Sequence, residues 1–356
     1  MKILCITPGN EQMKTPETGF AELLRKRGHQ VYLQYTGYST RYAVIDRGAL
    51  MFNPDVIWGM MEYSIPTAVI YKHLLNKPVY AHIECIPPWR TGIETPEEYG
   101  FDYEMSKPTM DRTGEYRQSY KDMIDNFNAC DAKTISGESW RYTFEKLTRE
   151  PLVADVRYYT YDNAPLKQYE KPSEEKNQIC TISRLTPTKR IHHTIQALAL
   201  IPKEDRPAFK IIGYGDQQDY LYKLADELEV DMSILGSGKD GLKEKTIQES
   251  MFMVQNFSAI PVLESAYYKK PCISYGTPHM KEVFGDMCTW VEPNNIEKLR
   301  DRIIEFSKNA NLRRDCGKNA HDIMVNNKSN VYNNEQFLDA VEEQLNKAIK
   351  NWGEDK

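Results

Sequence analysis

Short apolar runs alternate with helical patterns along most of this 356-residue chain. In the first half, we predict strands at residues 2–7, 31–35, 55–58, 79–83 and 133–136. In the second half, predicted strands begin near Gln178, Phe209, Met232, Phe252, Pro271 and Cys288. Strands that alternate with helices are joined by right-handed crossovers and form parallel sheets. The sequence therefore predicts an α/β protein with two doubly wound, Rossmann-like domains.

The length suits two domains of roughly 170 residues each. The segment 158–176 is polar and prone to turns, and we interpret it as the interdomain linker. We therefore expect an N-terminal domain at residues 1–165 and a C-terminal domain at residues 166–330. A final helix is predicted from apolar residues at helical spacing, namely Phe337, Leu338, Val341, Leu345 and Ile349.

Charge and composition exclude several classes of protein. The formal net charge is −5, which disfavours a generic nucleic-acid binder. The longest apolar runs are too short to span a bilayer and no leader-like segment precedes Met1, so we expect a cytoplasmic protein without an integral membrane segment. The seven cysteines are scattered and form no zinc-binding spacing, which favours reduced core thiols.

Charged residues follow two of the predicted strands in the second half. Arg184 and Lys189 come just after the strand at 178–182, and a cation pair at a strand exit suits the two negative charges of a nucleotide diphosphate. Glu264 lies at a predicted helix start, where a carboxylate can accept both hydroxyls of a ribose. Solvated loop cations and an acid favoured by the helix dipole are the structural alternatives. Together these residues predict a nucleotide site at the carboxyl edge of a parallel sheet.

These residues carry a resemblance to a known family. The chain matches the pattern R-x4-K followed by the end of an E-x7-E motif at Arg184, Lys189, Pro261, Glu264 and Ala266. Its opening segment, MKILCITPGN…RKRGHQVYL, is similar to the opening strand, loop and helix of the same family. The chain thus resembles a glycosyltransferase family 4 enzyme of GT-B architecture, apart from residues 85–121, which match nothing recognisable.

The resemblance implies two Rossmann-like domains facing a central cleft, with residues 331–356 crossing back to the first domain. It implies a retaining transfer of a sugar from a UDP- or GDP-sugar, without a metal or another cofactor. Arg184 and Lys189 would stabilise the leaving diphosphate, and Glu264 would hold the ribose. The acceptor stays open among a glycan, a lipid-linked sugar, a metabolite and a modified nucleic-acid base.

The chain departs from the family pattern in the middle of the donor motif. The first glutamate of E-x7-E falls at Asn256, which we expect to contact the donor sugar. This change implies an altered donor, weaker transfer or a protein that only binds. The following residues, Phe257, Ser258, Ala259 and Ile260, replace glycine-rich family residues and are expected to bring backbone amides toward the phosphates.

Three glycines follow predicted strands. Gly213 resembles the first glycine of a family G-x-G segment, and Gly236 follows the next strand, where such enzymes hold the nucleobase. Gly9 follows the first strand and is expected to approach the diphosphate. Plain turn glycines are the alternative at each position. A dehydrogenase is disfavoured, because PGNEQ follows the first strand in place of G-x-G-x-x-G.

The acceptor side is predicted from the strand at 79–83. Family members carry a histidine after it, but here Glu84 takes that place, with His82 two residues earlier on the same side. His82 has the alternative of a hydrogen-bonded core residue. Arg90 lies in the segment 85–121, which we interpret as an acceptor lid or a self-packed loop. A non-catalytic nucleotide-sugar or glycan binder and a sugar-nucleotide epimerase are the alternative functions.

Overall fold

The computed structural model describes residues 1–9, 16–36, 43–84, 122, 125–141, 145, 151–158, 160, 164–170, 173–256, 260–326 and 328–354. The described residues fall into two compact units. The N-terminal unit contains the described residues up to Thr160 together with those from Tyr332 onward. The C-terminal unit contains the described residues between them.

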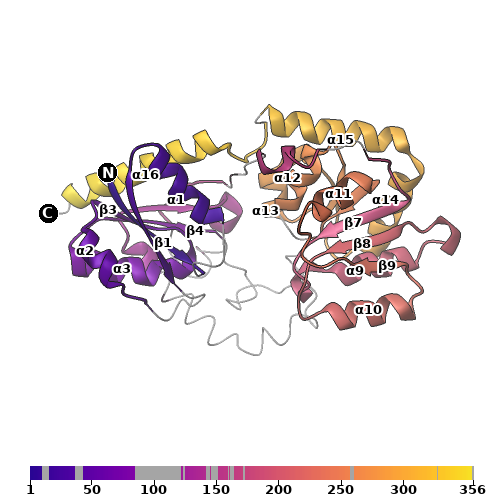
Figure 1. The fold of residues 1–356 in the computed structure, drawn as a ribbon, viewed down its shortest axis with the longest axis horizontal. Coiled ribbons are helices and arrows are strands. Elements are labelled where there is room, and N and C mark those ends of the chain that lie inside the picture. Colours follow the sequence, from indigo (N-terminus) through magenta and orange to yellow (C-terminus); the bar gives the residue numbers. More distant parts are fainter. Residues whose placement is uncertain are drawn as a thin grey trace. The chain divides into compact units, whose positions relative to one another are not determined.

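The N-terminal unit is built on a parallel sheet of six strands (Figure 1). The strands are β1 (Lys2–Pro8), β2 (Gln30–Thr36), β3 (Val56–Gly59), β4 (Val79–Ile83), β5 (Ala132–Ile135) and β6 (Asp155–Val156). Their spatial order is β2-β1-β3-β4-β5-β6, so the direction of winding reverses between β1 and β3. The first five strands confirm the predicted apolar runs, whereas the two-residue β6 was not predicted.

Helices cover both faces of this sheet. One face packs against α1 (Pro16–Lys26) and α16 (Asn334–Glu354), and the other packs against α2 (Arg47–Phe52) and α3 (Ile65–Leu75). A short turn, η1 (Glu62–Ser64), precedes α3. The buried stripe of α16 contains four of the five predicted residues, but Ile349 is 37% exposed and Ala348 is buried in its place.

The C-terminal unit has a second six-stranded parallel sheet. Its strands are β7 (Gln178–Ile182), β8 (Ala208–Ile212), β9 (Met232–Ile234), β10 (Phe252–Val254), β11 (Cys272–Tyr275) and β12 (Cys288–Val291). Their order is β12-β11-β10-β7-β8-β9, and the winding reverses between β7 and β10. Both sheets confirm the predicted α/β fold class with doubly wound topology.

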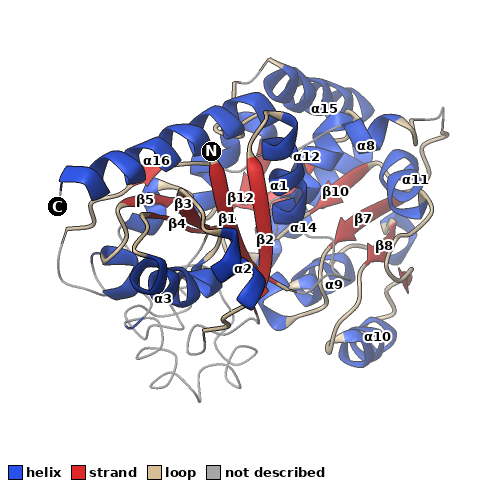
Figure 2. Ribbon diagram, turned by 60° about the vertical axis from the view of Figure 1, so that its left-hand side comes forward, coloured by secondary structure: helices blue, strands red, loops and turns tan. Residues whose placement is uncertain are grey.

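Helices also cover both faces of the second sheet (Figure 2). The main core lies under α9 (Ile191–Ala199), α10 (Gln218–Glu227) and α14 (Ile296–Lys308). The remaining helices are α8 (Ala164–Lys167), α11 (Leu242–Glu249), α12 (Ile260–Tyr267), α13 (Pro278–Phe284) and α15 (Ala310–Val325), with the short turns η3 (Pro187–Lys189), η4 (Lys203–Asp205) and η5 (Gly285–Met287). Among all the helices described here, none has the length and apolar character that crossing a membrane requires.

The reversal of winding positions the candidate sites. In an open parallel sheet, the loops that leave neighbouring strands at a reversal point run to opposite faces and leave a crevice at the carboxyl ends. In the C-terminal unit this crevice lies beyond β7 and β10. In the N-terminal unit the equivalent edge lies beyond β1 and β3.

Candidate functional site

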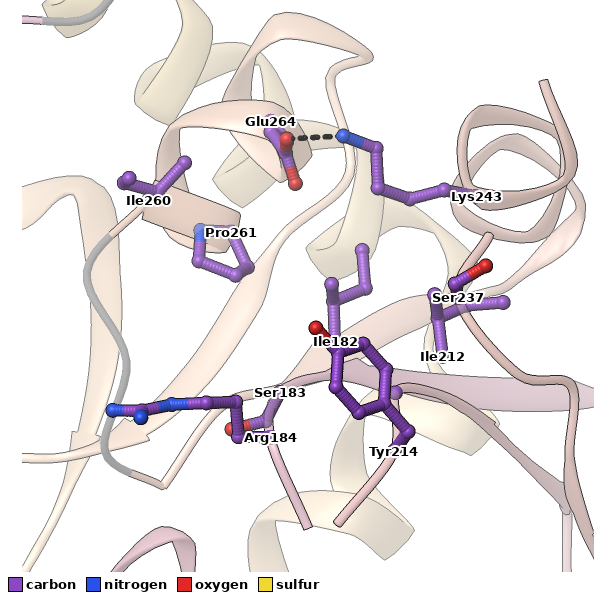
Figure 3. A pocket seen from close by; sticks show the side chains of 11 residues that line it. Ile182, Ser183, Arg184, Ile212, Tyr214, Ser237, Lys243, Ile260, Pro261 and Glu264 are labelled. Carbon is purple, nitrogen blue, oxygen red and sulfur yellow. Dashed lines mark hydrogen bonds and ion pairs between the residues drawn. The ribbon is translucent and has the colours of Figure 1, made fainter. Parts of the chain in front are cut away.

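A cavity of about 260 Å³ opens at the carboxyl ends of β7 and β8 in the C-terminal unit (Figure 3). It is formed by loops from β7, β8 and β9 together with α11 and α12. The described residues that line it are Ile182, Ser183, Arg184, Ile212, Gly213, Tyr214, Ser237, Lys243, Ile260, Pro261 and Glu264. Four of the predicted donor residues, Arg184, Gly213, Ile260 and Glu264, therefore share one cavity.

Backbone hydrogen bonds join the segments that follow β7, β8 and β9 beside this cavity. Ser183 donates its N–H to the carbonyl of Ile212 at 3.0 Å, and Gly213 donates to the carbonyl of Gly236 at 2.7 Å. A Cβ atom on Gly213 would lie 1.8 Å from the Ser183 carbonyl oxygen. Glycine is required at Gly213 because the two loops approach so closely.

Arg184 and Lys189 both follow β7, but only Arg184 lines the described cavity. Figure 3 shows the Arg184 side chain extending below Ile260 and Pro261, on the side of the cavity away from Ser237. Lys189 ends the short turn η3, where its N–H donates to the carbonyl of Thr186 at 3.0 Å. The role of Lys189 in binding diphosphate stays a prediction.

Glu264 is bound by a lysine that the sequence did not single out. Lys243 on α11 donates to Glu264 Oε1 at 2.6 Å and lies 3.4 Å from Glu244 Oε1. The side chains of Glu264 and Glu244 are 6% and 8% exposed, and that of Lys243 is 26% exposed. Burial by itself lowers the pKa of Lys243. The charges and hydrogen bonds of Glu264 and Glu244 outweigh this effect, so the pKa of Lys243 is raised. Lys243 thus stays charged and fixes the carboxylate of Glu264 at the cavity wall.

Asn256 follows β10 but does not line the described cavity. Its side chain is buried and donates to the carbonyl of Arg190 at 2.8 Å and to Thr194 Oγ1 at 3.2 Å. Arg190 has a φ of 49°, in the left-handed region, at the start of α9. The Asn256 amide therefore stabilises this turn, and its contact with the donor sugar stays a prediction. Phe257, Ser258 and Ala259 lie outside the described residues.

His192 and His193 lie in the first turn of α9, which follows the loop after β7. His193 Nδ1 is 2.9 Å from the Tyr275 hydroxyl, and the ring is buried. Burial, and then the charges of His192 and Arg190, lower the pKa of His193 to about 2. The ring of His193 is therefore neutral at physiological pH and serves the packing of this region.

The predicted acceptor-side residues lie in the N-terminal unit. His82 is fully buried on β4, and its Nε2 is 2.9 Å from Oε2 of Glu84. Burial, and then the charge of Arg157, hold the pKa of His82 well below its usual range, so this contact joins a neutral ring to a carboxylate. Gly9 has a φ of 111° and donates its N–H to Thr36 at 2.8 Å. Arg90 lies outside the described residues.

Within the described ranges, no three His, Cys, Asp or Glu side chains are grouped so that they could hold a metal ion.

Known proteins resemble this chain over both units. Residues 162–322 match the family model described as glycosyl transferases group 1. Poly(ribitol-phosphate) alpha-N-acetylglucosaminyltransferase of Staphylococcus aureus (strain COL) is 21% identical over 246 residues, which are 67% of this chain and 49% of that protein. N-acetyl-alpha-D-glucosaminyl L-malate synthase of Bacillus anthracis is 24% identical over 172 residues, which are 46% of this chain and 45% of that protein. The chain therefore spans about half the length of the curated relatives it matches.

A solved structure supports the architecture. The crystal structure of Anabaena Alr3699/HepE in complex with UDP-glucose has a TM-score of 0.72 to this chain at 14% identity, covering 96% of this chain and 99% of that one. This likeness shows the fold, and the family-model match of residues 162–322 lies within the C-terminal unit. The resemblance inferred from the sequence is thus confirmed: the fold is GT-B, and the C-terminal unit carries the match to the model of group 1 glycosyl transferases.

Proposed function

We propose that this protein transfers a sugar from a nucleotide-sugar donor to an acceptor hydroxyl with retention of anomeric configuration. The observation that carries the proposal is the cavity at the winding reversal of the C-terminal unit, which has Arg184 on one wall and Glu264 on another. Two cations and one carboxylate line its described part, which suits a ligand with both phosphates and hydroxyls.

The donor diphosphate would bind near Arg184 and Lys189. Each charge-assisted contact to a phosphate oxygen contributes about 1.5–3 kcal/mol. The same cations would stabilise the charge that develops on the departing diphosphate in the transition state. The leaving diphosphate would in turn help to deprotonate the acceptor on the same face of the sugar. With cations in this role we expect transfer to continue in the presence of EDTA, and loss of turnover on chelation would refute a metal-independent reaction.

The ribose would bind at Glu264. Its carboxylate accepts hydrogen bonds only, so it suits the two ribose hydroxyls as donors. Lys243 holds the carboxylate in place at 2.6 Å. Gly213 and Ser237 line the same cavity, where their backbone groups would face the nucleoside.

We infer that UDP is the nucleotide and N-acetylglucosamine the first sugar to test. The named Anabaena neighbour was solved with UDP-glucose, and both curated relatives are named for N-acetylglucosamine chemistry. The acceptor would be a hydroxyl compound such as a glycan, a lipid-linked sugar or a metabolite.

Binding and turnover test this function separately. UDP should raise the melting temperature more than GDP does, and incubation with UDP-N-acetylglucosamine should release UDP slowly even without an acceptor. Lys189→Ala should abolish this release while the protein stays folded by circular dichroism. Full release by Lys189→Ala would remove that residue from the mechanism. Binding of UDP without any release or transfer from a panel of UDP-sugars would favour the non-catalytic binder.

A further inference from the structure

A continuous line of hydrogen bonds runs through the interior of the N-terminal unit to Glu84. Arg157 donates from Nε to the Tyr80 hydroxyl at 3.0 Å, and this hydroxyl is 2.8 Å from Thr134 Oγ1. Thr134 Oγ1 is 2.8 Å from Nδ1 of His82, and Nε2 of His82 is 2.9 Å from Oε2 of Glu84. The line crosses from the loop after β6 through β5 and β4 to the carboxyl end of β4.

The chemistry of the two ends gives this line a single direction. The Nε of an arginine can only donate, so the Tyr80 oxygen accepts and its own hydrogen must point to Thr134, its other described contact. The Thr134 hydrogen then points to Nδ1 of His82. A neutral imidazole that accepts at Nδ1 carries its hydrogen on Nε2, and this hydrogen meets the carboxylate of Glu84. Every donor in the line therefore has an acceptor when His82 is the neutral Nε2–H tautomer.

Burial makes the opposite arrangement costly. Arg157, Tyr80, Thr134 and His82 are all buried. Reversing the line would leave the Tyr80 hydrogen without a described acceptor, and a buried polar group without a partner is destabilising because it has lost its hydrogen bonds to water. Arg157 is further fixed because its guanidinium lies 4.5 Å from the centre of the Phe337 ring on α16.

The last member of the line, Glu84, is partly exposed to solvent. Glu84 is 28% exposed on its side chain, in contrast to the buried members behind it. Its backbone is also fixed, because its N–H donates to Glu62 at 3.3 Å and its carbonyl accepts from the Ser136 hydroxyl. A carboxylate has about four acceptor positions, and the N–H of His82 takes one of them and orients the group.

We propose that His82, Thr134, Tyr80 and Arg157 are positioning residues that hold Glu84 as an oriented carboxylate for a hydroxyl group of the sugar or the acceptor. This inference rests on the proposed transfer reaction and adds a defined role for the interior of the N-terminal unit. His82 makes no contact with substrate; it fixes the direction in which the Glu84 oxygens point. A carboxylate held in this way accepts a hydrogen bond from a hydroxyl and repels a phosphate.

The tautomer of His82 can be measured without any substrate. In protein labelled with ¹⁵N-histidine, the nitrogen resonances of His82, identified by their loss in His82→Gln, should show a proton on Nε2 and none on Nδ1. Thr134→Val removes the donor to Nδ1 and should broaden or shift these resonances. A proton on Nδ1 in the unaltered protein overturns the inference, whatever the activity of the enzyme.

Two matched variants then test the link to turnover. The amide of glutamine reaches about as far as Nε2, so His82→Gln keeps a donor for Glu84, whereas the shorter His82→Asn reaches only Nδ1. We expect His82→Asn to lower kcat on the order of 100-fold. A displacement of about 1 Å in a group that contacts the substrate lowers the rate by about that factor. His82→Gln should restore most of the turnover, and UDP affinity should stay unchanged in both.

The outcomes separate the two proposals. Equal kcat values for His82→Asn and His82→Gln, with both folded, would show that the histidine serves packing alone and would overturn the positioning role. If the unaltered protein transfers no sugar from any UDP-sugar, the transfer function fails, and the nitrogen resonances still decide whether His82 is held as proposed.

Discussion

Lys243→Met removes the ammonium that two buried carboxylates share. Lys243 lies 2.6 Å from Glu264 and 3.4 Å from Glu244, whose side chains are 6% and 8% exposed. Removing one partner of a buried ion pair costs about 3–5 kcal/mol, because the remaining charge is desolvated without compensation. Lys243 is itself a quarter exposed, so water screens part of the interaction. We expect a loss at the lower end, about 3 kcal/mol of unfolding free energy.

Glu264→Gln should cost less stability than Lys243→Met but weaken nucleotide binding more. Glutamine keeps the size of the side chain, and Lys243 keeps Glu244 as a partner, so the stability loss should be about 1 kcal/mol. The nucleotide, in contrast, loses a charged acceptor for its ribose hydroxyls. A hydrogen bond to a charged group contributes about 1.5–3 kcal/mol, so the Kd for UDP should rise on the order of 10- to 100-fold. Lys243→Met retains the carboxylate and should weaken UDP binding less than Glu264→Gln does.

Urea denaturation followed by circular dichroism measures the first effect, and isothermal titration with UDP measures the second. The two units can unfold separately, so the relevant transition is the one whose midpoint UDP raises. The double variant Lys243→Met/Glu264→Gln should be less destabilised than the sum of the single changes, because each removes the same contact. The reasoning is refuted if Lys243→Met costs no more stability than Glu264→Gln, or if UDP binds Glu264→Gln as tightly as the unaltered protein.

Two further predictions concern the same unit. Gly213→Ala should destabilise it by about 3 kcal/mol or prevent folding, because the new Cβ would lie 1.8 Å from the Ser183 carbonyl oxygen. Gly236→Ala is the control, because a Cβ atom there would meet no atom within 4 Å and only the φ of 76° should cost about 1 kcal/mol of stability. Equal urea midpoints for the two variants would contradict the argument. His193 has a folded pKa of about 2 against an ordinary value of 6.5, so the unfolded chain gains its proton first and stability is lost as pH falls below about 6.5. His193→Asn should reduce the loss of unfolding free energy between pH 7 and pH 5 by about 2 kcal/mol, and an unchanged loss in urea titrations at the two pH values would count against the buried neutral ring.

The sequence predicted most strands because parallel strands are buried on both faces. Such strands appear as short continuous apolar runs, and the predicted bounds of β4 and β7 agree with the structure residue for residue. β6 was missed because it has two half-buried residues, Asp155 and Val156, with no pattern of their own. It is recognisable only through its pairing with β5, which a linear sequence does not reveal.

The candidate site was predictable where it depends on positions after strands. Arg184 and Glu264 were found this way, because the carboxyl ends of parallel strands meet at one edge. Lys243 was missed because it lies in the charged segment GKDGLKEK, which has the composition of an ordinary solvated helix. The sequence also did not predict that Asn256 is buried. Its amide donates to the carbonyl of Arg190, which has a left-handed backbone conformation and lies 66 residues earlier in the chain.

Both units are doubly wound, but the charges at the carboxyl edges of their sheets differ. At the carboxyl edge of the C-terminal sheet, Arg184 and Lys243 outnumber Glu264 among the described cavity residues, a balance that favours an anionic ligand. At the corresponding edge of the N-terminal sheet, Glu62 and Glu84 lie close together, since Glu62 accepts the Glu84 N–H at 3.3 Å. Two carboxylates repel a phosphate but accept hydrogen bonds from hydroxyls. If the proposed transfer is right, we expect the nucleotide to bind at the C-terminal edge and hydroxyl-bearing groups at the N-terminal edge, because of the charge at each edge.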